Sequence, residues 1–536
     1  MNTRTDKTCM PLSTGCCGYS RRDFLTGCAK CIGAVGAFSG LAVPTILAAE
    51  SYAPKRNMKI RVVFASLGEI AQEPCWPNIA FDVRPVIEKI MATLVSGCPT
   101  IEFVQSMVNS TKQAEDLMAA DKAKGDIEGY LLVHLVNKVQ RIIYALVDSK
   151  KPVLYADFVL GGSGTFLTSN AALLRRKTEN YAFMSSDDFS HLAAAANCFP
   201  LVKMGGFKVF VDGVTKVRKD IVAGVKVDLK CINDKFEILS IDDLKKELKT
   251  KRILTYEKPR EGEGIIQQIK DSFGIEVIMR PYNELNDLWE KADKAQATEI
   301  VNRWKNSAED IVGVRDMTLE KSARLYLAMK QCLKKHDACA ITINCLDGFY
   351  GGHIHAYPCL GHHELLNEGL IGACECDTLS TVTMVVMSTL TNGRSGFISD
   401  PAMDVATKQI IYAHCVASNK PFGPLGPSNP FTIMTHSEDR QGASVRSTLP
   451  VSYMTTTLRM RPERKEIVFH QAKTVGNSTI DRACRTKLVA VPIGDFEKLF
   501  TEWDRFGWHR VTYYGDLKEP IFAFADALGW KVIEEA

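Results

Sequence analysis

The feature that most constrains the fold is a regular alternation of strand-like and helix-like segments between residues 59 and 155. Short runs rich in aliphatic and β-branched residues alternate there with longer segments of helical periodicity. Strands joined by helices pair in parallel, because a right-handed crossover returns the chain to the same end of the sheet. We therefore predict an α/β protein that begins with a doubly wound parallel sheet. The expected strands are 59–66, 100–104, 129–134 and 152–155, and the expected helices are 84–95, 111–123 and 137–147.

The length of 536 residues suggests about three domains, since domains average roughly 150 residues. We predict two doubly wound parallel-sheet domains, 50–178 and 179–310, followed by an α/β plus β-rich domain over 311–536. In the second region the expected strands are 207–211, 225–229 and 274–278, and the expected helices are 241–249 and 285–306. In the third region the expected helices are 319–334, 496–505 and 522–528, and the expected strands are 338–344, 409–415, 451–459, 466–470 and 510–514.

The first 49 residues read as an export signal. Ser20-Arg-Arg-Asp-Phe-Leu25 matches a twin-arginine motif, an apolar stretch runs from Cys28 to Leu47, and Ala48-Ala49 offers small residues for cleavage. A membrane anchor is the alternative, but the stretch is short, glycine-rich and interrupted by Pro44. We therefore expect contact with the twin-arginine translocase, a periplasmic or exported location, and no membrane attachment after processing.

The net charge and the cysteine content indicate which partners and which thiol state to expect. The formal net charge is +4, and residues 1–49 hold five Lys/Arg and two Asp/Glu, so the mature chain carries 4 − 3 = +1. This balance predicts no nucleic-acid partner. Five of the 17 cysteines lie in the signal, and the other twelve are scattered. Because twin-arginine substrates fold in the reducing cytoplasm, we expect most of these twelve to be buried free thiols.

Two carboxylates each follow a strand-like run in the third region. Glu375 ends the run 369–375, a helix-like stretch spans 378–390, and Asp400 ends the run 395–400, which Pro401 should stop. Parallel pairing of the two runs would bring both acids to the carboxyl edge of one sheet. Two acids placed together there can hold a divalent cation or transfer protons. The alternative is that both cap neighbouring loops.

Several motifs of the third region resemble the L-fucose isomerase/L-arabinose isomerase superfamily, and in particular its short, exported fucose-isomerase-like members. The resemblance covers about residues 320–536, and before that it is only architectural. It rests on residues 338–344, Pro358-Cys-Leu, Leu365-Leu-Asn-Glu-Gly, Ala373-Cys-Glu-Cys-Asp377, Phe397-Ile-Ser-Asp-Pro401, Ala413-His-Cys415 and Trp508-His-Arg-Val-Thr.

The resemblance implies a C-terminal domain of the L-fucose isomerase type with a bound Mn²⁺ or another divalent cation. Glu375, Asp400 and His509 match the family's metal ligands, and the resemblance also gives the two carboxylates the proton-transfer role. Asp377 matches an acidic residue two positions after the glutamate, whereas Cys376 and the neighbours of His509 depart from the pattern. The resemblance further implies a homo-oligomer, a trimer or hexamer.

The chemistry of this residue set agrees with an aldose–ketose isomerase. Such an enzyme moves a proton between C1 and C2 through an enediol, which needs an acid/base pair and a cation that polarises O1 and O2. Two carboxylates and one imidazole suit Mn²⁺. We expect a monosaccharide or a modified sugar as substrate. A metal-dependent carbohydrate lyase or hydrolase, and an exported sugar-binding protein without turnover, are the alternatives.

Other polar groups of the third region each fit more than one role. His353-x-His355 and His362-His363-Glu364 fit a zinc site or an ordinary loop, but the resemblance places this loop over the substrate. Cys374-x-Cys376 fits a soft-metal site or two buried thiols. The segment 435–440 is dense in hydrogen-bonding groups that fit the hydroxyls of a sugar, and Arg459 fits an acidic substituent. An ordinary loop or surface group is the alternative for each. The predicted substrate-binding residues are His355, His436, Arg459 and Asp377.

Overall fold

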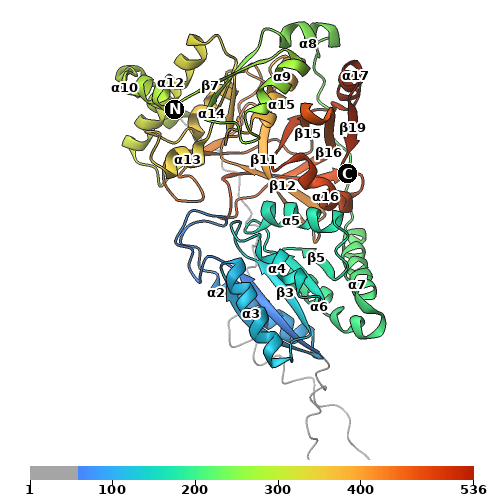
Figure 1. Cartoon of the computed structure of the whole chain (residues 1–536). Helices are drawn as coiled ribbons and strands as arrows, with labels where there is room; N and C mark the ends of the chain where they lie inside the picture. Colours follow the sequence, from blue (N-terminus) through green and yellow to red (C-terminus); the bar gives the residue numbers. More distant parts are fainter. Residues whose placement is uncertain (1–57) are drawn as a thin grey trace, which may run out of the picture. The chain divides into compact units, whose positions relative to one another are not determined.

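The computed structural model describes residues 58–536 (Figure 1). The expected export signal therefore lies outside the described residues. Within residues 58–536, none of the helices combines the length and the apolar character needed to cross a membrane.

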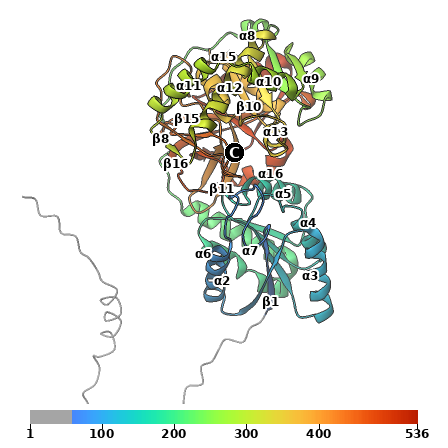
Figure 2. The ribbon, with the colours of Figure 1, turned by 90° about the vertical axis from the view of Figure 1, so that its left-hand side faces the viewer.

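The first sheet confirms the predicted doubly wound parallel sheet. Its strand order is β2-β1-β3-β4-β5, and every neighbouring pair is parallel. Helix α3 packs on α4, whereas α6 packs on both α2 and α7, so helices cover both faces (Figure 2). The strands are β1 (Met58–Ala65), β2 (Ile101–Val108), β3 (Gly129–His134), β4 (Val153–Asp157) and β5 (Tyr181–Ser185), and the helices are α2 (Arg84–Gly97), α3 (Thr111–Lys124), α4 (Ile142–Asp148), α5 (Ser163–Arg175), α6 (Phe189–Ala196) and α7 (Val202–Gly224).

The strands expected at 207–211 and 225–229 are wrong. The first lies inside helix α7, and the second has no regular structure. Phe210, Val214 and Arg218 are the buried residues of α7, and their spacing of four residues places them on one face of a helix. Five alternating residues are too few to distinguish a strand from one face of a helix.

The second sheet is also parallel, with the order β10-β9-β6-β7. It draws strands from both sides of residue 310. The predicted helix 285–306 is two helices, because the side chain of Asp293 caps a new N-terminus by accepting from the N–H groups of Ala295 and Gln296. The strands are β6 (Arg252–Tyr256), β7 (Glu276–Arg280), β9 (Ala340–Ile343) and β10 (Ile371–Cys374), and the helices of this region are α8 (Ile241–Leu248), α9 (Gly264–Phe273), α10 (Tyr282–Glu290), α11 (Lys294–Ser307), α12 (Asp316–Lys335), α13 (Cys345–Tyr350), α14 (Cys359–Asn367) and α15 (Thr378–Leu390).

The C-terminal part is the predicted β-rich region, and its main sheet closes on itself. The order is β15-β18-β11-β12-β17-β16-β19, and an additional pairing of β15 with β16 closes a six-stranded antiparallel ring. A small sheet, β14-β13-β8, lies beside it. The strands are β8 (Asp310–Val312), β11 (Phe397–Asp404), β12 (Gln409–His414), β13 (Phe431–Met434), β14 (Ser444–Ser447), β15 (Met454–Arg461), β16 (Glu466–Asn477), β17 (Thr486–Ile493), β18 (Arg510–Tyr514) and β19 (Lys531–Glu534), and the helices are α16 (Phe496–Glu502) and α17 (Lys518–Leu528).

The parallel pairing expected for the two carboxylate strands is wrong. Strand β10 belongs to the second parallel sheet, whereas β11 pairs antiparallel with β12 and β18 in the closed sheet. Strand composition indicates burial but not the hydrogen-bonding partner. Pro401 also does not end β11. It lies beyond Ser399, the last residue paired with β18, so its missing N–H leaves that side of the ladder intact.

Candidate metal centre and cavity

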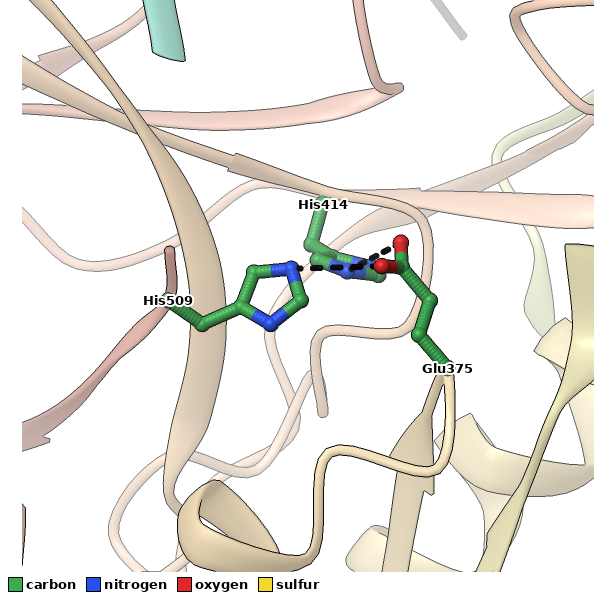
Figure 3. Close-up of side chains that lie close together, drawn as sticks. All are labelled: Glu375, His414 and His509. Atoms are coloured by element: carbon green, nitrogen blue, oxygen red, sulfur yellow. Dashed lines mark ion pairs between the residues drawn. The ribbon is translucent and has the colours of Figure 1, made fainter. Parts of the chain in front are cut away.

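Three side chains from separate elements offer metal-ligating atoms within 4.8 Å of one another: Glu375, His414 and His509 (Figure 3). Glu375 follows β10, His414 ends β12, and His509 precedes β18. The Nε2 atom of His509 lies 3.7 Å from Oε2 of Glu375, and Nε2 of His414 lies 3.9 Å from Oε1. Both histidines are buried. Elements far apart in sequence therefore converge on one point.

The backbone at Glu375 is unusual. Glu375 and Cys376 have positive φ angles of 63° and 47°, in the left-handed region that residues with a Cβ rarely occupy. Each such residue costs about 1–3 kcal/mol and persists only where surrounding structure holds it. Here the N–H of Cys376 donates to the carbonyl of Ile343 on β9, at 3.1 Å. The strained turn places the Glu375 side chain between the second sheet and the closed sheet.

Asp377 orients His509 through Nδ1, the ring nitrogen that does not face Glu375. Its Oδ2 lies 2.8 Å from Nδ1 of His509, and both of its oxygens accept from Arg459, at 2.7 and 2.9 Å. An ionised carboxylate only accepts, so Nδ1 of His509 carries the proton. Its Nε2 then faces Glu375 without a hydrogen-bond partner among the described residues. A buried imidazole with one nitrogen held and the other free is the usual arrangement of a metal ligand.

Asp400 lies beside His509 as well. Its Oδ1 is 3.2 Å from Nε2 of His509 and accepts a hydrogen bond from Nε1 of Trp508. Strand pairing explains the proximity, because Ser399 pairs with Arg510, the residue after His509. The structure thus brings Glu375, Asp400 and His509 together, as the sequence suggested. Their joint role as metal ligands stays a prediction.

His414 differs from His509 in its contacts. Its Nδ1 accepts from the backbone N–H of Cys415 at 3.0 Å, so the proton of the neutral ring belongs on Nε2, which faces Glu375. In this state the Nε2–H group of His414 faces Oε1 of Glu375 at 3.9 Å, which is too far for a hydrogen bond. Binding a cation through Nε2 requires the other tautomer, which loses the Cys415 contact.

Charge in this cluster is strongly coupled. Burial alone would lower the pKa of His509, but the neighbouring carboxylates Glu375 and Asp400 raise it to about 9. Burial alone would raise the pKa of Asp400, but His509 keeps it below its ordinary value. Arg260 donates to Oε2 of Glu375 at 2.8 Å and adds positive charge on the other side.

A cavity of about 260 Å³ is lined by Glu375, Asp400, His414 and Arg260, but not by His509 itself. Much of its lining comes from segments that follow parallel strands of both sheets: Asn137 after β3, Arg260 after β6, and Leu346 in helix α13 after β9. The carboxyl ends of parallel strands are the usual ligand-binding edge of α/β folds. The closed sheet contributes Asp400 and His414. The cavity therefore combines two ligand-binding edges with one polar cluster.

The residues present fit a divalent cation. The donors are oxygen and nitrogen atoms, and the Nε2 atoms of both His414 and His509 are buried without hydrogen-bond partners among the described residues. Leaving such polar atoms buried and unpaired costs about 1–3 kcal/mol each, which a bound cation would relieve. Carboxylate and imidazole ligands suit Mn²⁺, Fe²⁺, Co²⁺ or Zn²⁺.

The predicted substrate-binding residues lie in different places. His436 lines the cavity. Asp377 and Arg459 are buried behind His509, where Arg459 also donates to Glu261 at 3.1 Å. His355 is not among the cavity-lining residues, and its Nε2 lies 3.5 Å from Glu290. A substrate contact for these four residues stays a prediction.

Sequence reasoning gave no role to three polar groups of the cavity: His414, Arg260 and Glu438. His414 stood in a motif of the family resemblance, and its place at the end of a strand was a usable signal. Glu438 stood in the polar segment 435–440; its Oε2 accepts from the Tyr350 hydroxyl at 2.7 Å, and burial raises its pKa. No sequence pattern marked Arg260 as a site residue, because it meets Glu375 only through the tertiary structure.

The expectation of buried free thiols is confirmed. All twelve cysteines in residues 58–536 are unpaired, and ten of them are buried. Five of these line the cavity: Cys345, Cys359, Cys374, Cys415 and Cys484.

Comparison with known proteins supports the resemblance over part of the chain. No family model matches. The sulfoquinovose isomerase of Clostridium sp. (strain MSTE9) is 24% identical over 279 residues, which are 50% of this chain and 60% of that protein. Those of Priestia aryabhattai and Priestia megaterium (strain ATCC 12872 / QMB1551) are each 20% identical over 172 residues, 32% of this chain and 36% of the relative. The chain thus covers 60% or less of these relatives. This partial similarity supports the resemblance to the L-fucose isomerase/L-arabinose isomerase superfamily.

Proposed function

We propose that this protein is a metal-dependent aldose–ketose isomerase that acts on a monosaccharide or a modified sugar. The observation that carries the proposal is the convergence of Glu375, Asp400, His414 and His509 beneath one cavity. The relatives named sulfoquinovose isomerase support the same reaction class. Sulfoquinovose therefore belongs among the first substrates to test.

The four side chains would hold a divalent cation, with Mn²⁺ as our first candidate. A cation bound there would polarise the O1 and O2 oxygens of an open-chain sugar. Glu375 and Asp400 exchange the proton between C1 and C2, since carboxylates positioned beside the reacting carbons serve as general acid and base. Asp377 holds His509 in the ligand tautomer, and Arg260 keeps positive charge beside Glu375.

The remaining polar groups of the cavity suit a sugar. Glu438 and His436 line it together with the aromatic rings of Phe349 and Trp508. Sugars present hydroxyl groups and C–H faces together, so a cavity with both polar and aromatic walls is complementary to them. We assign Glu438 and His436 to hydroxyl contacts.

The decisive experiment is solvent-deuterium incorporation. The mature protein, loaded with Mn²⁺, is incubated in D₂O with aldoses and ketoses that include deoxy, acidic and sulfonated sugars, sulfoquinovose among them. We expect deuterium at C1 or C2 of at least one sugar, together with its isomer. The Glu375→Gln variant, loaded with the same metal, is the matched control and should exchange at least about 10²-fold more slowly. If no sugar exchanges, the isomerase proposal fails in favour of a lyase, a hydrolase or a binding protein.

Two further proposals concern location and assembly. We propose export by the twin-arginine pathway, on the evidence of the motif at Arg21-Arg22, and a homo-oligomer, trimer or hexamer, on the family resemblance. Cell fractionation and light scattering of the purified mature protein test these two proposals separately.

A further inference from the structure

A second, smaller cavity of about 190 Å³ lies between β14 and the turn that precedes β17. It shares no lining residue with the cavity over Glu375. Four basic side chains line it, against one carboxylate, Asp481, which gives a formal charge of 4 − 1 = +3. The four are Arg440, Arg446, Arg485 and Lys487.

Two of the four cations already share Asp481. Arg440 donates to it at 2.8 and 3.0 Å, and Arg485 donates at 2.7 Å. The other donors of Arg485 reach the carbonyl and the hydroxyl of Thr435, at 2.7 and 3.0 Å. This arrangement leaves no carboxylate in the lining for Lys487 or Arg446.

Lys487 is a buried cation without an acidic partner. Its side chain is only 3% exposed, and its one hydrogen bond is to the carbonyl of Cys484, at 2.7 Å. An ammonium group has three donors, so two have no acceptor in the described part of the chain. Burial lowers the pKa of Lys487 to about 8, which reflects the cost of holding its charge there.

Arg446 is the second unpaired cation. Within residues 58–536, its guanidinium makes no hydrogen bond or ion pair. Strand β14, which carries it, is tied to β17 through Thr486, whose Oγ1 accepts from the N–H of Ser447 and donates to the carbonyl of Val445, both at 3.0 Å. Arg446 and Lys487 are therefore presented from two neighbouring strands, which are rigid supports for a binding site.

From this geometry we propose that the cavity binds a small tetrahedral oxyanion, phosphate or sulfate, either free or as an ester group. Lys487 supplies a point charge and Arg446 a forked pair of donors, the two usual means of holding such an anion. The volume equals that of about six water molecules at roughly 30 Å³ each, which leaves room for the anion. The proposal does not depend on the proposed isomerase activity.

Calorimetric titration of the full-length protein with inorganic phosphate and with sulfate tests the proposal, at constant ionic strength set with chloride. We expect one anion per chain, and a rise in Tm with phosphate. Arg446→Gln and Lys487→Met should each weaken binding about tenfold or more, the effect of losing one charge-assisted hydrogen bond. Lys219→Met, which removes an exposed charge on α7, is the matched control and should bind like the wild type.

Two further readouts sharpen the test. Without anion, the Lys487→Met variant should have the same Tm as the wild type or a higher one. The methionine side chain has a volume similar to that of lysine but carries no buried, unpaired charge. Titration with glucose 6-phosphate distinguishes a free anion from an ester group as the ligand. Tighter binding of glucose 6-phosphate than of phosphate indicates an organic ester, and tighter binding of phosphate indicates a free ion. The proposal is wrong if neither anion binds beyond chloride, or if Arg446→Gln binds as the wild type does.

Discussion

Nδ1 of His509 lies 2.8 Å from Oδ2 of Asp377, and this contact decides which ring nitrogen faces Glu375. Asp377 is in turn held by Arg459 and caps helix α15 by accepting from the N–H of Ser380. One buried carboxylate therefore joins a helix start, an arginine and a candidate metal ligand. Partners of this kind fix the tautomer and the orientation of a ligating histidine.

Replacing Asp377 by Asn should affect both metal binding and stability. We expect Mn²⁺ affinity to fall about 10–100-fold, because His509 loses its anionic partner. We expect the free energy of unfolding to fall by about 1–3 kcal/mol, because the buried Arg459 guanidinium keeps only Glu261 as a carboxylate partner. Calorimetry and urea denaturation measure the two effects. Arg459→Lys is the matched control, since it breaks the forked pair and should destabilise the protein while largely preserving Mn²⁺ affinity.

Glu375→Gln should remove activity more completely than it removes metal. The amide keeps an oxygen for coordination but cannot accept a proton, so we expect a loss of about 10²–10⁴-fold or more in turnover. Asp400→Asn should behave similarly. Steady-state rates and bound metal, measured on the same preparations, check this. A parallel loss of metal and rate would show that both carboxylates act mainly as ligands.

His509→Ala should weaken Mn²⁺ binding more than His414→Ala, by about tenfold or 1.4 kcal/mol. This comparison applies above pH 9, where Nε2 of His509 carries no proton and Asp377 already holds the ring in place, whereas His414 must change tautomer and give up the Cys415 contact. Mn²⁺ titrations of the two variants give the comparison directly. Equal losses would mean that the His414 tautomer has no energetic consequence.

The pH dependence of metal binding follows from His509. Its pKa in the metal-free protein is about 9, above the ordinary 6.5, and a metal bound through Nε2 must displace that proton. Apparent Mn²⁺ affinity should rise about tenfold per pH unit up to about pH 9 and then level off. In the metal-free protein the stabilisation from the raised pKa is complete below about pH 6.5 and is lost as the pH rises through 9. Titrations at pH 7, 8 and 9 test the first point, and a flat affinity between pH 7 and 8 would contradict it.

Replacing both Arg21 and Arg22 by Lys should abolish export and leave the protein folded. Lysine keeps the charge but not the forked donors of the guanidinium pair. Fractionation of cells that express the double variant, with circular dichroism of the retained protein, measures both outcomes. Normal periplasmic accumulation would show that this segment has another role.

The first parallel sheet was predictable because its strands are short, apolar and separated by helices that each show their own period. Helix 378–390 and strand 510–514 were also predicted with the bounds that the structure shows. Whether a segment forms a helix or a strand depends mainly on residues close to it in the sequence, so the sequence alone can predict it. The errors at 207–211 and at Pro401 arose where a short pattern fitted two structures.

The sequence by itself determined the α/β class, the buried thiols and the grouping of Glu375, Asp400 and His509 as candidates. Only the tertiary structure decided that β10 and β11 lie in different sheets, that His414 and Arg260 join Glu375, and that Lys487 and Arg446 face one cavity. The physical reason is that these contacts join strands distant in sequence. Which strands pair depends on which partner satisfies their backbone hydrogen bonds, and the local pattern of apolar residues does not specify that partner.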